Sequence, residues 1–192
     1  MAILVVTPRR FSDERGWFSE TYNARKWGPL LSDVSFVQDN ESYSRQTGTV
    51  RGLHYQRPPF GQAKLVRCLR GSILDVAVDL RVGSPTYGQS VSFELSATSG
   101  QQIFIPIGFA HGFMTLEPDT EIAYKVSEFY APDHEFGLKW DDPALAIKWP
   151  TPPTGAHLSP KDQELGGFKD FESPFAYDGV PMALTVMPEG IV

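Results

Sequence analysis

The 192-residue sequence contains a single cysteine, Cys68, and this excludes an internal disulfide framework and a zinc site built from several cysteines. It has no apolar run close to the roughly 20 residues that span a bilayer, and its first ten residues lack the features of a signal peptide. Its net charge of −6 disfavours non-specific binding to nucleic acid, which needs clustered Lys and Arg. We therefore expect a cytoplasmic protein with neither a nucleic-acid nor a membrane partner.

Several cofactor and catalytic motifs are missing as well. The sequence has no G-x-G-x-x-G dinucleotide motif, no G-x-x-x-x-G-K-[ST] phosphate loop and no G-x-S-x-G hydrolase motif. Its histidines are never paired at H-x-H or H-x-x-x-H spacing; they are His54, His111, His134 and His157. Because a metal site usually needs three or four ligands, the unpaired histidines predict no bound metal. The missing motifs predict no cofactor.

What the sequence does contain is a series of short segments in which apolar and polar residues alternate. Residues 73–80, 91–96 and 121–126 all follow this period of two, which is typical of strands with one buried face. In the first segment, Asp75 and Asp79 fall on the face opposite the apolar residues. Gly and Pro separate the segments as turn signals. The pattern predicts an all-β sandwich or barrel.

Helix signals are scarce and domain boundaries are absent. The best helix candidate is Asn23–Leu31, in which Asn23 can cap the start and Gly28-Pro29 ends the helix early. The proline-rich residues 149–160 predict an extended strap over the surface. We expect a single domain over residues 1–192, with a core at about 3–165 and a tail at 166–192 that forms a short helix, a lid or a partner contact.

One segment resembles a known barrel superfamily. Residues 100–111 have the form G-x5-P-x-G-x2-H, which is similar to the second motif of the cupins, jelly-roll barrels in which this histidine faces the lumen. The first cupin motif normally supplies H-x-H and a Glu as metal ligands. The corresponding strand here, residues 51–56, carries only His54. The resemblance implies a cupin-type jelly-roll barrel with a few short helices and no metal.

A more specific resemblance follows from a series of spaced blocks. The blocks are Arg51-Gly-Leu-His54-Tyr-Gln56, Lys64-Leu-Val-Arg67, Asp75-Val-Ala-Val-Asp79, Gly83-Ser-Pro85, Pro106-Ile-Gly-Phe-Ala-His111-Gly-Phe113, Tyr124-Lys125, Trp140-Asp-Asp-Pro143 and Leu158-Ser-Pro-Lys-Asp162. In this order they resemble the dTDP-4-dehydrorhamnose 3,5-epimerase family over about residues 3–165. The resemblance implies epimerisation of dTDP-4-dehydro-6-deoxy-D-glucose at C3 and C5 to dTDP-4-dehydro-L-rhamnose, in dTDP-L-rhamnose biosynthesis.

This reaction needs a base, a group that stabilises an enolate, and an acid on the opposite face of the sugar. A histidine, with an ordinary pKa of about 6.5, can accept a proton at neutral pH, and the resemblance assigns His54 as the base and Asp162 as its partner. Lys64 continues the apolar alternation of its strand and is the expected enolate stabiliser. Tyr124, between apolar neighbours on one strand face, is the expected acid, with Tyr130 as its rival.

The remaining expected contacts bind the nucleotide sugar. Strand alternation places His54 on the face of Gly52, which leaves room for a ligand, and puts Arg51 on the opposite face unless a bulge turns it. The family pattern nevertheless assigns Arg51 to the diphosphate. The resemblance also implies a homodimer whose N-terminal strands, from Ile3, cross to the partner. The full set of expected binding residues is Arg15, Glu20, Gln38, Asn40, Arg51, His111, Tyr130, Glu135, Trp140 and Lys161.

Three alternatives to the double epimerase stay open at this point. The first is an epimerase of the same fold that inverts only C3 or only C5, because both kinds of enzyme share His54, Lys64 and Tyr124. The second is a metal-dependent cupin that binds a metal ion through His54 and His111. The third is a sugar-nucleotide binding module without catalysis.

Overall fold

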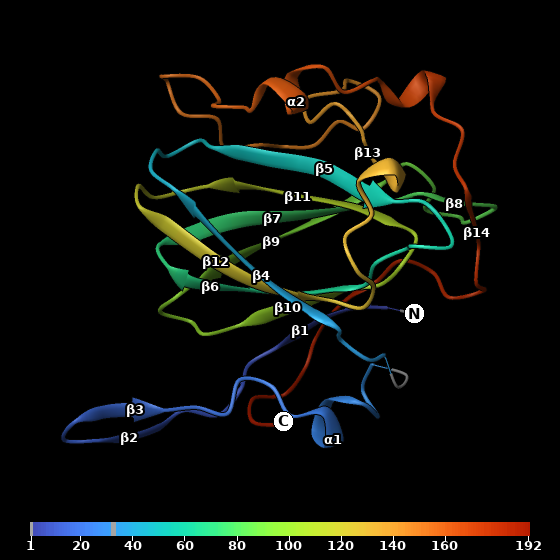
Figure 1. The fold of residues 1–192 in the computed structure, drawn as a ribbon. Coiled ribbons are helices and arrows are strands. Elements are labelled where there is room, and N and C mark those ends of the chain that lie inside the picture. The colour runs from blue at the N-terminus through green and yellow to red at the C-terminus, as the bar shows by residue number, and fades with distance from the viewer. Residues whose placement is uncertain (1, 32–33) are drawn as a thin grey trace.

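The structure is a computed structural model that describes residues 2–31 and 34–192. Two β-sheets face each other and form a flattened barrel (Figure 1). The six-stranded sheet has the order β15 (Leu184–Val186), β1 (Ile3–Val6), β10 (Gln102–Ile105), β6 (Lys64–Arg70), β12 (Thr120–Val126), β4 (Gln38–Ser44). The five-stranded sheet has the order β13 (Glu135–Gly137), β5 (Val50–Gln56), β11 (Phe109–Thr115), β7 (Ser72–Asp79), β9 (Ser90–Ser96). The predicted all-β barrel is confirmed.

The helices are short, as the sequence predicts. Helix α1 (Ala24–Trp27) begins after Asn23, whose side-chain oxygen accepts a hydrogen bond from the backbone N–H of Arg25. The chain leaves the helix at Gly28, so the predicted cap and early end are confirmed. The other helices are α2 (Pro160–Gln163), η1 (Pro132–His134) and η2 (Phe168–Asp170). Within the described residues, every helix is too short or too polar to span a bilayer.

Strand β7 is buried on both faces, and this corrects the prediction of a strand with one buried face. Ile73 and Ala77 pack in the core between the sheets, while Val76 and Val78 pack on the outer face under residues 138–175. The irregular segment at 149–160 is part of this outer layer, above β5 in Figure 1. Because both faces are covered, the carboxylates of β7 are buried and need partners inside the protein.

The tail at residues 166–192 adds two short strands that pair with strands of the preceding chain. Strand β14 (Phe175–Ala176) pairs with β8 (Arg81–Val82), and β15 pairs in parallel with β1. Arg81 is only 2% exposed and binds Asp79 on one side and Asp178 of the tail on the other. Strand β1 therefore lies between β10 and β15 of its own chain, and the crossing of N-terminal strands to a partner subunit stays a prediction.

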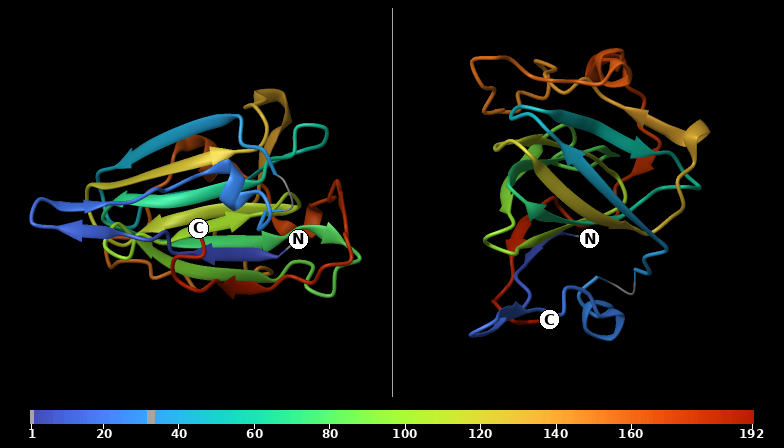
Figure 2. Two further views of the ribbon diagram at one scale, coloured as in Figure 1. Left: turned by 90° about the horizontal axis from the view of Figure 1, so that it is seen from below. Right: turned by 60° about the vertical axis from the view of Figure 1, so that its left-hand side comes forward.

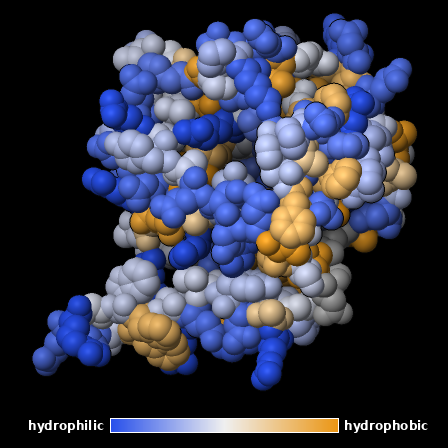
Figure 3. Space-filling model, viewed as in Figure 1, coloured by the Kyte–Doolittle hydropathy of each residue, from blue (hydrophilic) through white to orange (hydrophobic). Residues whose placement is uncertain are grey.

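A hairpin of β2 (Phe11–Asp13) and β3 (Gly16–Phe18) projects from the barrel, as Figures 1 and 2 show. Its two strands pair only with each other among the described residues. Phe11, Trp17 and Phe18 are each more than half exposed, and apolar atoms are visible on the hairpin in the space-filling view (Figure 3). The barrel's own core therefore leaves the apolar side chains of this arm uncovered.

Candidate active site

A cavity of about 250 Å³ opens between the two sheets. Strands β5 and β11 supply one wall, β6 and β12 supply the opposite wall, and β13 and α2 close one side. The cavity is lined by Ser42, Arg51, His54, Lys64, His111, Phe113, Ile122, Tyr124, Glu135, Ser159, Lys161 and Asp162. The structure thus brings together all four expected catalytic residues and four of the expected binding residues.

A bulge in β5 places Arg51 and His54 on the same side. In the pairing with β11, His54 lies opposite His111 whereas Arg51 lies opposite Phe113, so β5 carries one extra residue between them. Gly52 sits at this point with a φ of +120°, and a Cβ there would come within 2.6 Å of the Gly112 Cα. Gly52 therefore provides close backbone packing rather than the expected room for a ligand.

His54 is paired with Asp162. Nε2 of His54 lies 2.6 Å from Oδ1 of Asp162, and the Asp162 side chain is only 5% exposed. Helix α2 holds this carboxylate, and the backbone N–H of Asp162 donates to the Ser159 hydroxyl at the helix start. Burial raises the pKa of Asp162, but the hydrogen bond and charge of His54, together with hydrogen bonds from Ser159 and the Gly52 backbone, outweigh burial, and the pKa is lowered. Asp162 is thus a carboxylate that orients the imidazole.

A second histidine–aspartate pair lies directly beside the first. Nε2 of His111 is 2.8 Å from Oδ2 of Asp75, which is fully buried on the inner face of β7. Burial lowers the pKa of His111, although Asp75 opposes the shift. The other oxygen of Asp75 makes no hydrogen bond within the described residues. Sequence reasoning assigned no role to Asp75, because alternation placed it on the polar face of its strand; the structure puts it on the core side of β7, the strand that pairs with the histidine strand β11.

Lys64 begins β6 and reaches the cavity from the six-stranded sheet. The next residues on its face, Val66 and Cys68, belong to the core, as the alternation predicts. Burial lowers the pKa of the Lys64 amine from 10.5 to about 8, while the charges of Glu135 and Asp75 favour the protonated form. A partly dehydrated cation held beside the cavity is suited to stabilise a developing negative charge.

Tyr124 enters the cavity from β12, the neighbour of β6. It lies between Ile122 and Val126, which are both buried, so the prediction of an inward-facing side chain is confirmed. Burial raises the pKa of the Tyr124 phenol, and the negative charge of Glu135 adds to this effect. The phenol therefore stays protonated at neutral pH and can donate a proton.

Glu135 and Lys161 of the cavity wall are linked to the half-exposed Tyr130, and we call the place where these three side chains meet the cavity mouth. Glu135 binds Lys161 through an ion pair and accepts a hydrogen bond of 2.8 Å from the Tyr130 hydroxyl. Burial raises the pKa of Glu135, but these two bonds and the positive charges of His54 and Lys161 together outweigh burial, and the pKa is lowered. Tyr130 is 51% exposed and its pKa is raised by the bond to Glu135. The phenol at the mouth is thus tied to the cavity wall.

Comparison with known proteins identifies this arrangement. The profile that describes dTDP-4-dehydrorhamnose 3,5-epimerases matches residues 2–170. The chain belongs to this family. A dTDP-4-dehydrorhamnose 3,5-epimerase of Sinorhizobium fredii is 53% identical over 175 residues, which make up 91% of this chain and 89% of that protein. The family, the enzyme class and the cupin-type fold expected from the sequence are therefore confirmed.

Solved structures of related epimerases share the same fold. The 3,5-epimerase of Legionella pneumophila, in complex with dTDP-4-keto-L-rhamnose, has a TM-score of 0.85 at 43% identity and covers 90% of this chain and 93% of its own. A 3′-monoepimerase of Streptomyces bikiniensis, in complex with dTDP-quinovose, has a TM-score of 0.80 at 32% identity and covers 86% and 83%. Epimerases with this fold therefore include enzymes that invert two carbons and enzymes that invert one.

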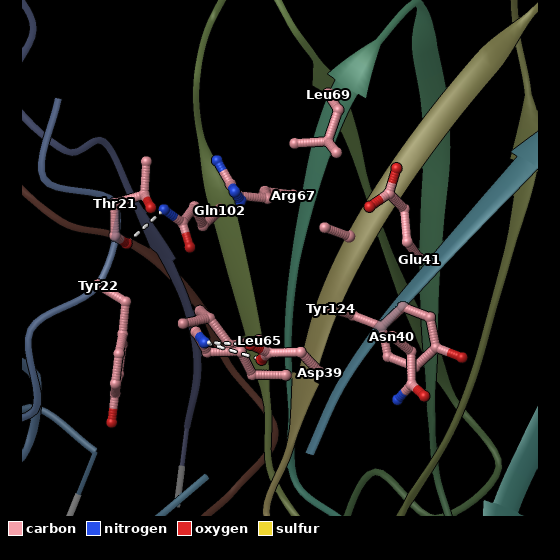
Figure 4. A pocket seen from close by; sticks show the side chains of 12 residues that line it. Thr21, Tyr22, Asp39, Asn40, Glu41, Leu65, Arg67, Leu69, Gln102 and Tyr124 are labelled. Carbon is pink, nitrogen blue, oxygen red and sulfur yellow. Dashed lines mark hydrogen bonds and ion pairs between the residues drawn. The ribbon is translucent and has the colours of Figure 1, made fainter. Parts of the chain in front are cut away.

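A larger hollow of about 460 Å³ adjoins the epimerase cavity along β4 and β12 (Figure 4). Asn40 and Tyr124 line this hollow, and Tyr124 also lines the cavity. Gln38 donates a hydrogen bond of 2.7 Å to the side-chain oxygen of Asn40. The two amides expected to contact the base are therefore adjacent, and one of them faces a space beside the expected acid.

Three expected binding residues lie elsewhere in this chain. Arg15 is at the tip of the hairpin, where it pairs with Asp13. Glu20 pairs with Lys26 beside α1. Trp140 lines a separate hollow, in which its ring lies 5.9 Å from that of Trp149. The geometry of this chain therefore does not support a place for Trp140 in the cavity wall.

No group of three or more His, Cys, Asp or Glu side chains arranged to hold a metal ion occurs among residues 2–31 and 34–192. Both cavity histidines instead direct Nε2 to an aspartate. Each imidazole is thereby oriented by a carboxylate, which suits proton transfer.

Proposed function

We propose that this chain inverts C3 and C5 of dTDP-4-dehydro-6-deoxy-D-glucose and so produces dTDP-4-dehydro-L-rhamnose for dTDP-L-rhamnose biosynthesis. The C4 ketone acidifies the protons on both neighbouring carbons, and inversion removes a proton from one face and returns one to the other. One observation carries the proposal: His54 and Tyr124 line a single cavity from opposite sheets, with Lys64 also in the wall. The arrangement offers a base and an acid on the two sides of a bound ring.

Each step follows from these positions. His54 donates its Nε2–H to Asp162, so the other ring nitrogen takes the proton from carbon, and Asp162 stabilises the imidazolium that results. The electron pair of the broken C–H bond moves to the ketone oxygen, where the Lys64 ammonium stabilises the enolate. Tyr124 then protonates the carbon from the opposite side. His54 then releases its proton to solvent and Tyr124 regains one from solvent, so both groups are ready for the second inversion. Each inversion exchanges one proton for another and changes no oxidation state, so the reaction consumes no electron acceptor.

The decisive experiment is proton NMR of the substrate with pure protein in D2O. Deuterium at both C3 and C5 with the product of double inversion supports the proposal. Exchange at one carbon alone supports a single-centre epimerase, the alternative that the likeness to the 3′-monoepimerase keeps open. Binding of dTDP without any exchange supports a binding module and overturns the proposal.

A homodimer is part of the proposal. The hairpin exposes Phe11, Trp17 and Phe18 and carries Arg15 at its tip, away from the cavity of its own chain. Burial of these apolar side chains against a second copy would remove them from water. An arm that docks in this way would bring Arg15 to the diphosphate bound by the partner, where a guanidinium binds well.

Two further expectations from the sequence are kept as proposals. The first is a single domain over residues 1–192, which is supported by the pairing of tail strands β14 and β15 with β8 and β1. The second is a cytoplasmic location for the enzyme.

A further inference from the structure

The loop that carries Tyr130 combines an exposed side chain with a tightly held main chain. The Tyr130 N–H donates a hydrogen bond of 3.0 Å to the side chain of Gln38. On either side, the carbonyl of Phe129 and the N–H of Ala131 both bond to the side chain of Gln56, at 3.1 and 2.8 Å. The main chain is therefore fixed at three consecutive residues, whereas the tyrosine ring between them is half exposed.

Gln56 uses both N–H donors and the carbonyl oxygen of its amide. Besides its two bonds around Tyr130, it donates a bond of 2.7 Å to the carbonyl of Phe60 in the β5–β6 loop. Its side chain is 4% exposed, so a lost bond would leave a buried main-chain group without a partner. Gln56 also lies two residues after His54 on β5. The strand that carries the base thus also holds the Tyr130 loop.

The Tyr130 hydroxyl is fixed from the other end by Glu135. Glu135 accepts its hydrogen bond at 2.8 Å and lines the cavity together with Lys161. Glu135 is moreover the register partner of Gln56 between β13 and β5. The main chain around Tyr130 is therefore held by Gln56, and its hydroxyl is held by the residue paired with Gln56 on the neighbouring strand. Together these contacts hold the phenol at the cavity mouth.

We propose that Gln56 is a positioning residue, which holds Tyr130 at the mouth so that the sugar is retained between the two inversions. This rests on the proposed double epimerisation, in which an intermediate inverted at one carbon must either react again or leave. A phenol fixed at the mouth favours the second reaction over release, whereas a loop without its anchor favours release. Gln56 itself touches no substrate in this account.

The test compares Gln56→Met with Gln62→Met. Gln62 supplies a single bond of 2.8 Å to the same loop, at the carbonyl of Glu128, so the two variants make the same chemical change. In D2O, Gln56→Met should raise the ratio of singly to doubly inverted sugar about fivefold or more, the factor expected from one lost hydrogen bond. Gln62→Met should keep the wild-type ratio. An unchanged ratio in folded Gln56→Met overturns the proposal.

A second comparison separates positioning from general loss of structure. If Gln56 acts through Tyr130, the Gln56→Met change should alter the ratio less than about twofold in a Tyr130→Phe background, because coupled residues are not additive. Equal effects in both backgrounds contradict the proposal. A wild-type enzyme that inverts only one carbon, or none, contradicts the proposed function instead, so the two failures are distinct.

Hydrogen exchange on the wild-type protein gives a test that does not depend on a folded variant. The amides of Tyr130 and Ala131 should be strongly protected, although the Tyr130 side chain is half exposed. Exchange of both amides at the rate of an open loop would show that the anchor does not form, and would overturn the proposal.

Discussion

His54 and Tyr124 face one cavity from opposite sheets, the first from β5 and the second from β12. Each sheet also supplies a second polar group, His111 beside His54 and Lys64 on the strand next to Tyr124. Because the groups sit on separate strands, a single substitution can remove one of them while the opposite wall stays in place. The proposed roles are therefore separable by experiment.

The first prediction concerns the base. His54→Asn should lower kcat by about 10²–10⁴, the usual contribution of a positioned base, and should leave the affinity for dTDP nearly unchanged, because proton abstraction belongs to the transition state. The matched control is His157→Asn, since His157 lies outside the cavity and should keep wild-type turnover. Steady-state kinetics with dTDP titration checks both; a His54→Asn enzyme with near-normal kcat would remove His54 from the role.

The second prediction concerns the pH dependence of the rate. With its pKa lowered to about 8, Lys64 loses its positive charge as the pH rises through that value. We expect kcat to fall above about pH 8, whereas the raised pKa of Tyr124 keeps that phenol protonated in the same range. Lys64→Met should lose about 10²–10³ in kcat at pH 7 and should lack this alkaline limb. An identical limb in Lys64→Met would contradict the assignment.

The third prediction applies the same pKa to stability. Unfolded Lys64 keeps its proton to about pH 10.5, whereas the folded protein releases it at about 8, so the unfolded state binds more protons between these values. The free energy of unfolding should therefore rise across this window, and Lys64→Met should remove the rise. Lys64→Met should also be more stable than the wild type at pH 7, by up to about 3 kcal/mol from 1.36 kcal/mol per pKa unit. Urea unfolding at pH 7 and pH 10 measures both effects, and a less stable Lys64→Met at pH 7 would contradict them.

The fourth prediction concerns the bulge in β5. Gly52→Ala should lower the free energy of unfolding by about 2–4 kcal/mol, because it adds positive-φ strain to a clash with Gly112. The control is Gly155→Ala, at a positive φ with nothing within 4 Å of the added Cβ, which should cost only about 1–2 kcal/mol. Denaturant unfolding measures both, and equal losses would mean that the close approach of β5 and β11 does not matter.

The fifth prediction tests the exchange of arms between subunits. Arg15→Ala should raise KM, and His54→Asn should lack turnover. In an equal mixture after subunit exchange, half of the dimers are mixed, and each has one complete site if Arg15 acts in the partner's cavity. The mixture should then recover about a quarter of the wild-type kcat/KM. A mixture that only averages the two separate variants would contradict the crossed arrangement.

Strand alternation predicted the two residues of the six-stranded sheet well. Lys64 and Tyr124 each share a face with apolar neighbours, and the side chains beside them are indeed in the core. Local pattern was sufficient here because β6 and β12 are regular over the residues concerned. The helix start after Asn23 was also predicted, because its capping signal is local as well.

The side chains on the wall formed by the five-stranded sheet could not be placed from strand alternation alone. One extra residue in β5 turns Arg51 to the side of His54, and nothing in a period of two reveals on which side of a bulge a residue falls. Asp162 reaches His54 from 108 positions away, so only the family resemblance connected them. Asp75 was interpreted as lying on a polar face, because the outer layer that buries the opposite face of β7 is formed by distant residues.

The most direct test of the two-sided cavity is the fate of substrate with Tyr124→Phe in D2O. If His54 and Tyr124 act from opposite sides, this variant can still remove a proton and return a deuteron through His54 on the same face. Proton NMR should therefore show deuterium entering the sugar with its configuration retained, at a rate at least about tenfold above that of net inversion. Inversion at the wild-type rate, or loss of exchange and inversion together, would contradict the account.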